Sequence, residues 1–160
     1  MKETPMTYRI SGLSPEPFAE LLTLDDAALA QRGALRVTAT AKPGFPCRIT
    51  LEDADVGEEL ILLQHVSHDV ATPYRSAYAI YVRVDARETA TYHNVLPPVF
   101  KGRPIALRGF DGAGMLKGAL LALPGQADEQ IRDLFARDEI AYIHAHNAAH
   151  GCFAARIDRA

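Results

Sequence analysis

The chain holds two cysteines, and each has an arginine near it in the sequence. The first pair, Cys47 and Arg48, follows the turn-forming run Pro43–Pro46. A cation beside a thiol favours the thiolate, which is the nucleophilic form of cysteine. Free cysteine is also among the most buried residue types, so Cys47 fits equally a small apolar side chain at the start of a strand. The turn alone accounts for the prolines and the glycine, which favours the buried interpretation.

The second cysteine lies in a segment rich in histidine, Tyr142–Arg156. On a strand, His144 and His146 point to the same face. In a thiol enzyme, Cys152 or Cys47 would be the nucleophile, His144 or His146 its base, and an arginine would stabilise developing negative charge. The same two histidines with a cysteine would also ligate a metal. A plainer interpretation is that the histidines and Arg156 line the polar face of a hairpin.

Two weaker groupings lie in the middle of the chain. His65, His68 and Asp69 have side chains that bind metals, although no third nearby donor completes a ligand set. Tyr74 and Arg75 occupy a polar loop in which the guanidinium would bind an anion. Each grouping also fits an ordinary exposed loop.

Composition narrows the functional class. The chain has 160 residues, 48% hydrophobic and 23% charged, with a net charge of −3 and no basic run, which argues against a nucleic-acid partner. It contains no apolar stretch long enough to span a membrane, and the polar segment Met1–Tyr8 lacks the apolar centre of a signal peptide. We therefore expect a cytoplasmic protein with free thiols. The sequence lacks a nucleophile elbow, a P-loop, a His-Glu-x-x-His motif and a Cys-x-x-Cys motif.

The residue pattern predicts one α+β domain spanning residues 1–160, with a mostly antiparallel sheet. Two short helices near the N-terminus and a longer one near the C-terminus pack on that sheet. The first follows the helix-start residues Ser14 and Pro15, and the second begins at Asp25 and stops at Gly33. The third spans Gln126–Arg137. Expected strands are Thr7–Ser11, Leu35–Ala41, Cys47–Leu51, Leu60–Val66, Tyr78–Val84, Ile105–Phe110, Met115–Leu123, Ile140–Ala148 and Cys152–Asp158.

The last two strands form a hairpin whose register is set by burial. Only some registers place their apolar residues on one face, and a three-residue loop, Ala149–Gly151, with Gly151 left-handed, satisfies this condition. This register pairs His146 with Ala154, His144 with Arg156, Ala148 with Cys152 and Tyr142 with Asp158. It places His144, His146, Cys152 and Arg156 on one face, which we expect the Cys47 and Arg48 turn to approach.

Five segments together resemble domain-of-unknown-function family 1203, a group of small bacterial proteins. They are Ala41–Arg48, Leu51–Ala54, Pro73–Ser76, Arg108–Asp111 and Tyr142–Arg156. The resemblance runs from about Tyr8 to Arg159 and is most specific in the two segments that carry cysteines. It implies a bacterial single-domain protein, and no activity or catalytic residue comes with it.

We therefore expect a small-molecule site, either for binding or for thiol-dependent catalysis, built from the two cysteine segments. Several arginines favour an anionic ligand, and no particular cofactor or oligomeric state is indicated. A metal-binding protein and a non-catalytic interaction module are the alternatives. The residues assigned to the site are Cys47, Arg48, Tyr74, Arg75, His144, His146, Cys152 and Arg156.

Overall fold

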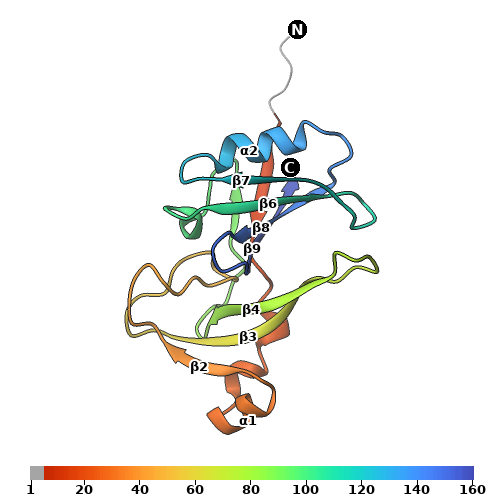
Figure 1. The fold of residues 1–160 in the computed structure, drawn as a ribbon. Coiled ribbons are helices and arrows are strands. Elements are labelled where there is room, and N and C mark those ends of the chain that lie inside the picture. Colours follow the sequence, from red (N-terminus) through yellow and green to blue (C-terminus); the bar gives the residue numbers. More distant parts are fainter. Residues whose placement is uncertain (1–5) are drawn as a thin grey trace.

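The computed structural model describes residues 6–160, so the first five residues of the polar N-terminal segment lie outside it. The fold is α+β, with two mostly antiparallel sheets and few helices (Figure 1). The larger sheet has the strand order β5-β1-β9-β8-β6-β7, and the smaller has the order β2-β3-β4. The helices α1 and α2 lie at opposite ends of the molecule, α2 beside the larger sheet and α1 beside the smaller.

The strands of the larger sheet come from both ends of the chain. They are β1 (Tyr8–Ser11), β5 (Thr91–His93), β6 (Ile105–Phe110), β7 (Leu116–Ala122), β8 (Tyr142–Asn147) and β9 (Phe153–Arg159). The smaller sheet consists of β2 (Leu35–Thr38), β3 (Glu59–His68) and β4 (Ser76–Arg83).

Each sheet buries its own core. The helix α2 (Ala127–Phe135) packs its apolar face, Ile131, Leu134 and Phe135, against the larger sheet, as its sequence period predicts. The smaller sheet packs against α1 (Asp26–Gln31) and the segment before it. Asp25 caps α1 by accepting a hydrogen bond from Ala28 N, which confirms the predicted start of this helix. Within residues 6–160, no helix has the length and apolar character needed to cross a membrane.

The prediction of an α-helix after Ser14 and Pro15 is wrong. Residues after Ser14 form two separate 3-10 turns, Glu16–Phe18 and Leu21–Thr23, instead of an α-helix. Pro17 has no N–H to donate, and the Thr23 hydroxyl bonds the carbonyl of Glu20, so the backbone closes short i to i+3 bonds. Among the described residues, the N-terminal part therefore has one α-helix and not two.

The predicted strand Cys47–Leu51 is also wrong. Its alternation breaks at Arg48, which is as buried as its apolar neighbours Cys47 and Ile49. The segment instead forms a turn in which Leu51 N donates to Cys47 O and Leu51 adopts a positive φ of 56°. This turn replaces a strand at the edge of the smaller sheet, where Cys47 forms an isolated bridge to Tyr81 of β4.

The predicted hairpin is present as β8 and β9, and part of its register is confirmed. Tyr142 pairs with Asp158 and His144 pairs with Arg156. The register shifts by one residue beyond Ala145, so that His146 faces Phe153 and not Ala154. The predicted pairs of His146 with Ala154 and of Ala148 with Cys152 are wrong, because Cys152 O accepts from Asn147 N within a longer loop.

Candidate functional site

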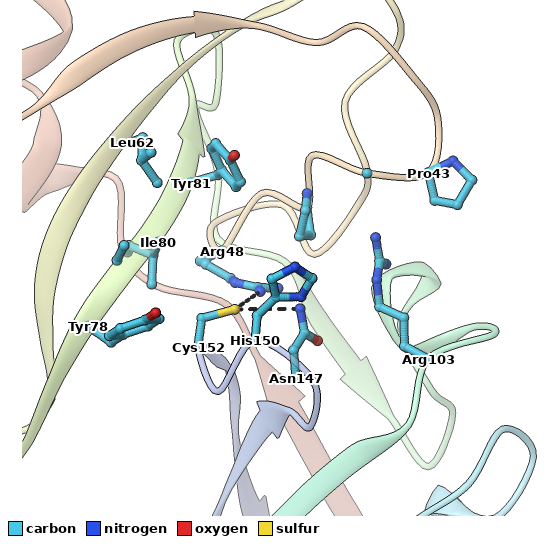
Figure 2. Close-up of a pocket in the computed structure, with 13 residues that line it drawn as sticks. Pro43, Arg48, Leu62, Tyr78, Ile80, Tyr81, Arg103, Asn147, His150 and Cys152 are labelled. Carbon is cyan, nitrogen blue, oxygen red and sulfur yellow. Dashed lines mark hydrogen bonds between the residues drawn. The ribbon is translucent and has the colours of Figure 1, made fainter.

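A pocket of about 390 Å³ lies where three parts of the fold meet. One wall is the edge of β4, another is the turn that ends at Arg48, and the third is the loop between β8 and β9 (Figure 2). Its polar side chains are Arg48, Arg103, Asn147, His150 and Cys152. Its remaining walls are Pro43, Gly44, Pro46, Leu62, Tyr78, Ala79, Ile80 and Tyr81.

The backbone of Arg48 is fixed from two sides. Its N–H donates to Tyr81 O on β4 (3.0 Å), and its carbonyl accepts from Leu13 N (2.8 Å). The chain at Gly12 passes so close that an added Cβ would lie 2.2 Å from the carbonyl oxygen of Ile49, so only glycine fits there. The position of Arg48 therefore depends on residues distant from it in the sequence.

The guanidinium of Arg48 is buried, and it has no carboxylate partner within residues 6–160. The residue is 1% exposed, and its Nη2 donates to Cys152 Sγ at 3.2 Å. Its Nε and Nη1 are buried and have no hydrogen-bond partner among the described residues. Burial lowers the pKa of Arg48, and the Cys152 sulfur opposes this effect. A buried charge is costly unless it is paired, and within residues 6–160 no carboxylate is hydrogen-bonded to the Arg48 guanidinium.

Cys152 lies at the end of the β8–β9 loop. Gly151, at a φ of 81°, turns the chain, and Gly151 N donates to Asn147 O (2.8 Å). The Cys152 sulfur accepts from Arg48 and, at 3.6 Å, from Asn147 Nδ2. The sulfur therefore lies between a guanidinium and a side-chain amide, and both donate to it. The Oδ1 atom of Asn147 is buried with no partner among residues 6–160.

Arg103 supplies a second guanidinium, and this one is paired. It donates to both carboxylate oxygens of Asp53, at 2.6 and 2.9 Å, and to the carbonyl of Val99. Burial by itself would raise the pKa of Asp53, but hydrogen bonds from Arg103 and Gly44 N outweigh it and hold the pKa below its ordinary value. The Arg103–Asp53 pair is therefore a structural part of the wall, and Arg48 is the cation there without a carboxylate partner.

Cys47 lies in a hydrophobic core, whereas Cys152 lines the pocket. Its side chain is fully buried in the core of the smaller sheet. The sulfur accepts backbone N–H groups of Ile49 (3.4 Å), Thr50 (3.5 Å) and Arg83 (3.3 Å). These contacts hold the turn that carries Arg48, and Cys47 itself does not line the pocket.

His144 and His146 are buried between the two sheets, not exposed on a polar face as the plain interpretation expected. With His68, Phe110, Tyr142 and Phe153 they form what we call the histidine cluster. His68 of β3 shares a hydrogen bond with Tyr142, with its Nε2 atom 2.6 Å from the hydroxyl oxygen. The centre of its ring lies 4.9 Å from that of His144. These contacts join the smaller sheet to the larger one.

Two rings of the histidine cluster, those of His144 and His146, are buried deeply enough to favour the neutral form. Burial lowers the pKa of His144 to about 3, with smaller contributions from nearby cations. Burial likewise lowers the pKa of His146 to about 4, opposed by a bond between Nδ1 and Gly151 O. Neither ring lines the pocket, so neither is placed to act as a base for Cys152.

The other predicted site residues lie on the surface. Arg156 is exposed, bonds Asp158 and stacks over the Tyr142 ring at 4.3 Å. Arg75 is exposed and pairs with Asp69, while Tyr74 packs near Phe110. His144, His146 and Arg156 share a face as predicted, but Cys152 does not join them. Its sulfur contacts Asn147, whose side chain points away from that of His146.

The metal site considered from the sequence requires several ligand side chains placed close together. Within residues 6–160, no group of three or more His, Cys, Asp or Glu side chains is placed to hold an ion. His144 and His146 instead contact aromatic rings, Arg108 and a backbone carbonyl.

Residues 44–159 match the model of DUF1203, described as a protein of unknown function. The chain belongs to this family. The expected resemblance is thereby confirmed, and the match includes Arg48, Arg103 and Cys152. No curated protein and no solved structure matches the chain.

The sequence did not indicate several pocket residues. Arg103 follows the proline-rich stretch between β5 and β6, and its partner Asp53 is fifty positions away. Asn147 and His150 belong to the histidine-rich segment, but no spacing distinguishes them from their neighbours. The burial of Arg48 distinguishes it from the other arginines, and this burial is visible only in the fold.

Proposed function

We propose that the pocket binds a small anionic molecule, with Arg48 neutralising its charge and the Cys152 thiol beside it. The observation that supports this most is the buried guanidinium of Arg48, two of whose nitrogens have no partner within residues 6–160. A buried donor without a partner costs about 1–3 kcal/mol, and more when it is charged, so such groups mark places where a ligand completes the structure.

Cys152 is the thiol that such a ligand would meet. It lines the same pocket, and its sulfur already contacts the guanidinium. The bases suggested by the sequence, His144 and His146, lie outside the pocket, so the proposal assigns the thiol a place next to the ligand and assigns no proton-transfer partner.

The test follows alkylation of Cys152 by iodoacetamide, read by mass spectrometry, with and without acetate, propionate or inorganic phosphate. A bound anion covers the sulfur, so we expect saturable protection of Cys152. Arg48→Met should abolish the protection. The control is Arg75→Met, which removes an exposed guanidinium outside the pocket and should leave protection unchanged.

If no anion of this panel slows alkylation or raises the melting temperature, the proposal is wrong. Equal protection in the wild type and Arg48→Met would also overturn it, because the anion would then bind elsewhere.

A further inference from the structure

The pocket exposes the backbone of a strand edge, at Ala79 of β4. In an antiparallel pair, the N–H and C=O groups of alternate residues point to the partner strand and to the open edge. Tyr81 O accepts from Arg48 N and Arg83 N donates to Cys47, so these two residues face away from β3. The β3–β4 register is regular from Leu60 to Val66, so Ala79 has the same orientation as Tyr81 and Arg83.

The turn carrying Arg48 covers this edge only in part. Cys47 bridges to Tyr81, and the preceding chain, Pro43–Pro46, bends away to form the opposite wall of the pocket (Figure 2). The N–H and C=O of Ala79 therefore point to the pocket instead of to a neighbouring strand. An extended ligand would pair with this edge as an added strand does, its amide N–H donating to Ala79 O and a neighbouring oxygen accepting from Ala79 N–H.

Apolar side chains flank the same edge. Leu62 and Tyr81 are directly opposite each other, so they share one face of the smaller sheet. Tyr78 and Ile80 point to the other face, and Tyr78 is 56% exposed. All four line the pocket, which gives an apolar group of the ligand a surface to cover.

We propose that the ligand is a short peptide-like carboxylate, such as an N-acylated amino acid or the C-terminal residue of a peptide. Its carboxylate is neutralised by Arg48, its amide pairs with Ala79, and its apolar side chain packs against the wall. This inference rests on the anion site proposed above and names the class of anion. The pocket volume of about 390 Å³ suits a ligand of one or two residues.

Three probes separate the parts of this ligand, with binding measured by titration calorimetry. N-acetyl-leucine has the carboxylate, the amide and the apolar group, 4-methylpentanoate lacks the amide, and N-acetyl-leucinamide lacks the carboxylate. One hydrogen bond is worth roughly fivefold in affinity, so N-acetyl-leucine should bind about fivefold or more tightly than 4-methylpentanoate. N-acetyl-leucinamide should bind weakest.

A pair of proline substitutions tests the strand edge. Ala79→Pro replaces the outward N–H with the pyrrolidine ring, which obstructs the edge that the ligand amide would occupy, and it should reduce binding of N-acetyl-leucine to the level of 4-methylpentanoate. Ala77→Pro is the matched control, because Ala77 has the same orientation on the same strand but lies outside the pocket. Proline is tolerated at outward positions of edge strands, and circular dichroism checks the fold of both variants.

A second measurement needs no variant. N-methylation of the amide in N-acetyl-leucine removes the donor to Ala79 O and should lower affinity for the wild type by at least about fivefold. Equal affinity for N-acetyl-leucine, its N-methyl derivative and 4-methylpentanoate would overturn the peptide-like ligand and leave the anion site standing. Absence of binding by every carboxylate, together with no binding of phosphate, would overturn both.

Discussion

The pocket and the histidine cluster both contain buried basic side chains, but these side chains differ in whether they carry a charge near pH 7. In the histidine cluster, burial lowers the pKa of His144 and His146, so the rings are neutral near pH 7 and pack against aromatic side chains. An arginine cannot lose its proton in this way. Arg48 therefore remains a cation in need of a partner. A buried histidine can be a packing residue, whereas a buried unpaired arginine points to a ligand.

The largest expected effect tests the neutral state of the histidine cluster. The unfolded chain has histidine pKa values near 6.5, so between about pH 6.5 and pH 4 it binds more protons than the folded chain. Stability is complete above pH 6.5 and falls as the pH decreases through this window. From about pH 7 to pH 5 the free energy of unfolding should decrease by on the order of 4 kcal/mol, measured by urea denaturation.

The variant His144→Gln should make this pH dependence shallower, because one of the two lowered pKa values is removed. His93→Gln is the control, since His93 is exposed on β5. Identical slopes for the wild type and His144→Gln would show that His144 is not held neutral by burial. Paired carboxylates such as Asp53, whose pKa is below its ordinary value, contribute only at lower pH.

The second prediction compares the two arginines of the pocket. Arg103→Met leaves the buried Asp53 carboxylate without its partner and should cost about 3 kcal/mol of unfolding free energy. Arg48→Met removes a charge that has no carboxylate partner, so stability should change by less than about 1 kcal/mol or increase. Chemical denaturation at pH 7 measures both. A large loss for Arg48→Met would mean that the fold itself satisfies this charge.

The smallest expected effect distinguishes the two cysteines. Cys47→Ser places a shorter, more polar side chain in the core of the smaller sheet and should cost about 2 kcal/mol. Cys152→Ser should cost less than about 1 kcal/mol, because Cys152 is only half-buried and serine still accepts from Arg48. Thermal unfolding of both variants checks this order. The reverse order would assign Cys152 a structural role instead.

The periodicity of apolar residues was sufficient to predict strands and helices wherever burial of one face determines the local structure. The hairpin β8–β9 is an example, because one face of each strand must be apolar and only some registers allow this. The bulge beyond Ala145 could not be predicted, because the extra residue in β9 is Ala154, whose small side chain does not mark a face of the strand. This one-residue shift is what turns Cys152 away from the histidines.

The pocket depends on contacts that no local pattern encodes. Arg48 appeared to be the polar member of an alternating strand, although its burial is imposed by β4 and by the chain near Gly12. The two cysteine segments were expected to meet, and they do so through Arg48 and Cys152. The sequence could not show which cysteine would face the core and which the pocket, because both are flanked by similar residues.

The central position of β9 has a consequence for how the chain folds during synthesis. β9 lies between β1 and β8, so it joins the first strand to the three strands β8, β6 and β7. The smaller sheet is complete once residue 83 has left the ribosome, but the larger sheet stays in two pieces until β9 emerges. Cys152 directly precedes β9. The pocket is therefore assembled at the same late step as the sheet, and an incomplete chain would have neither.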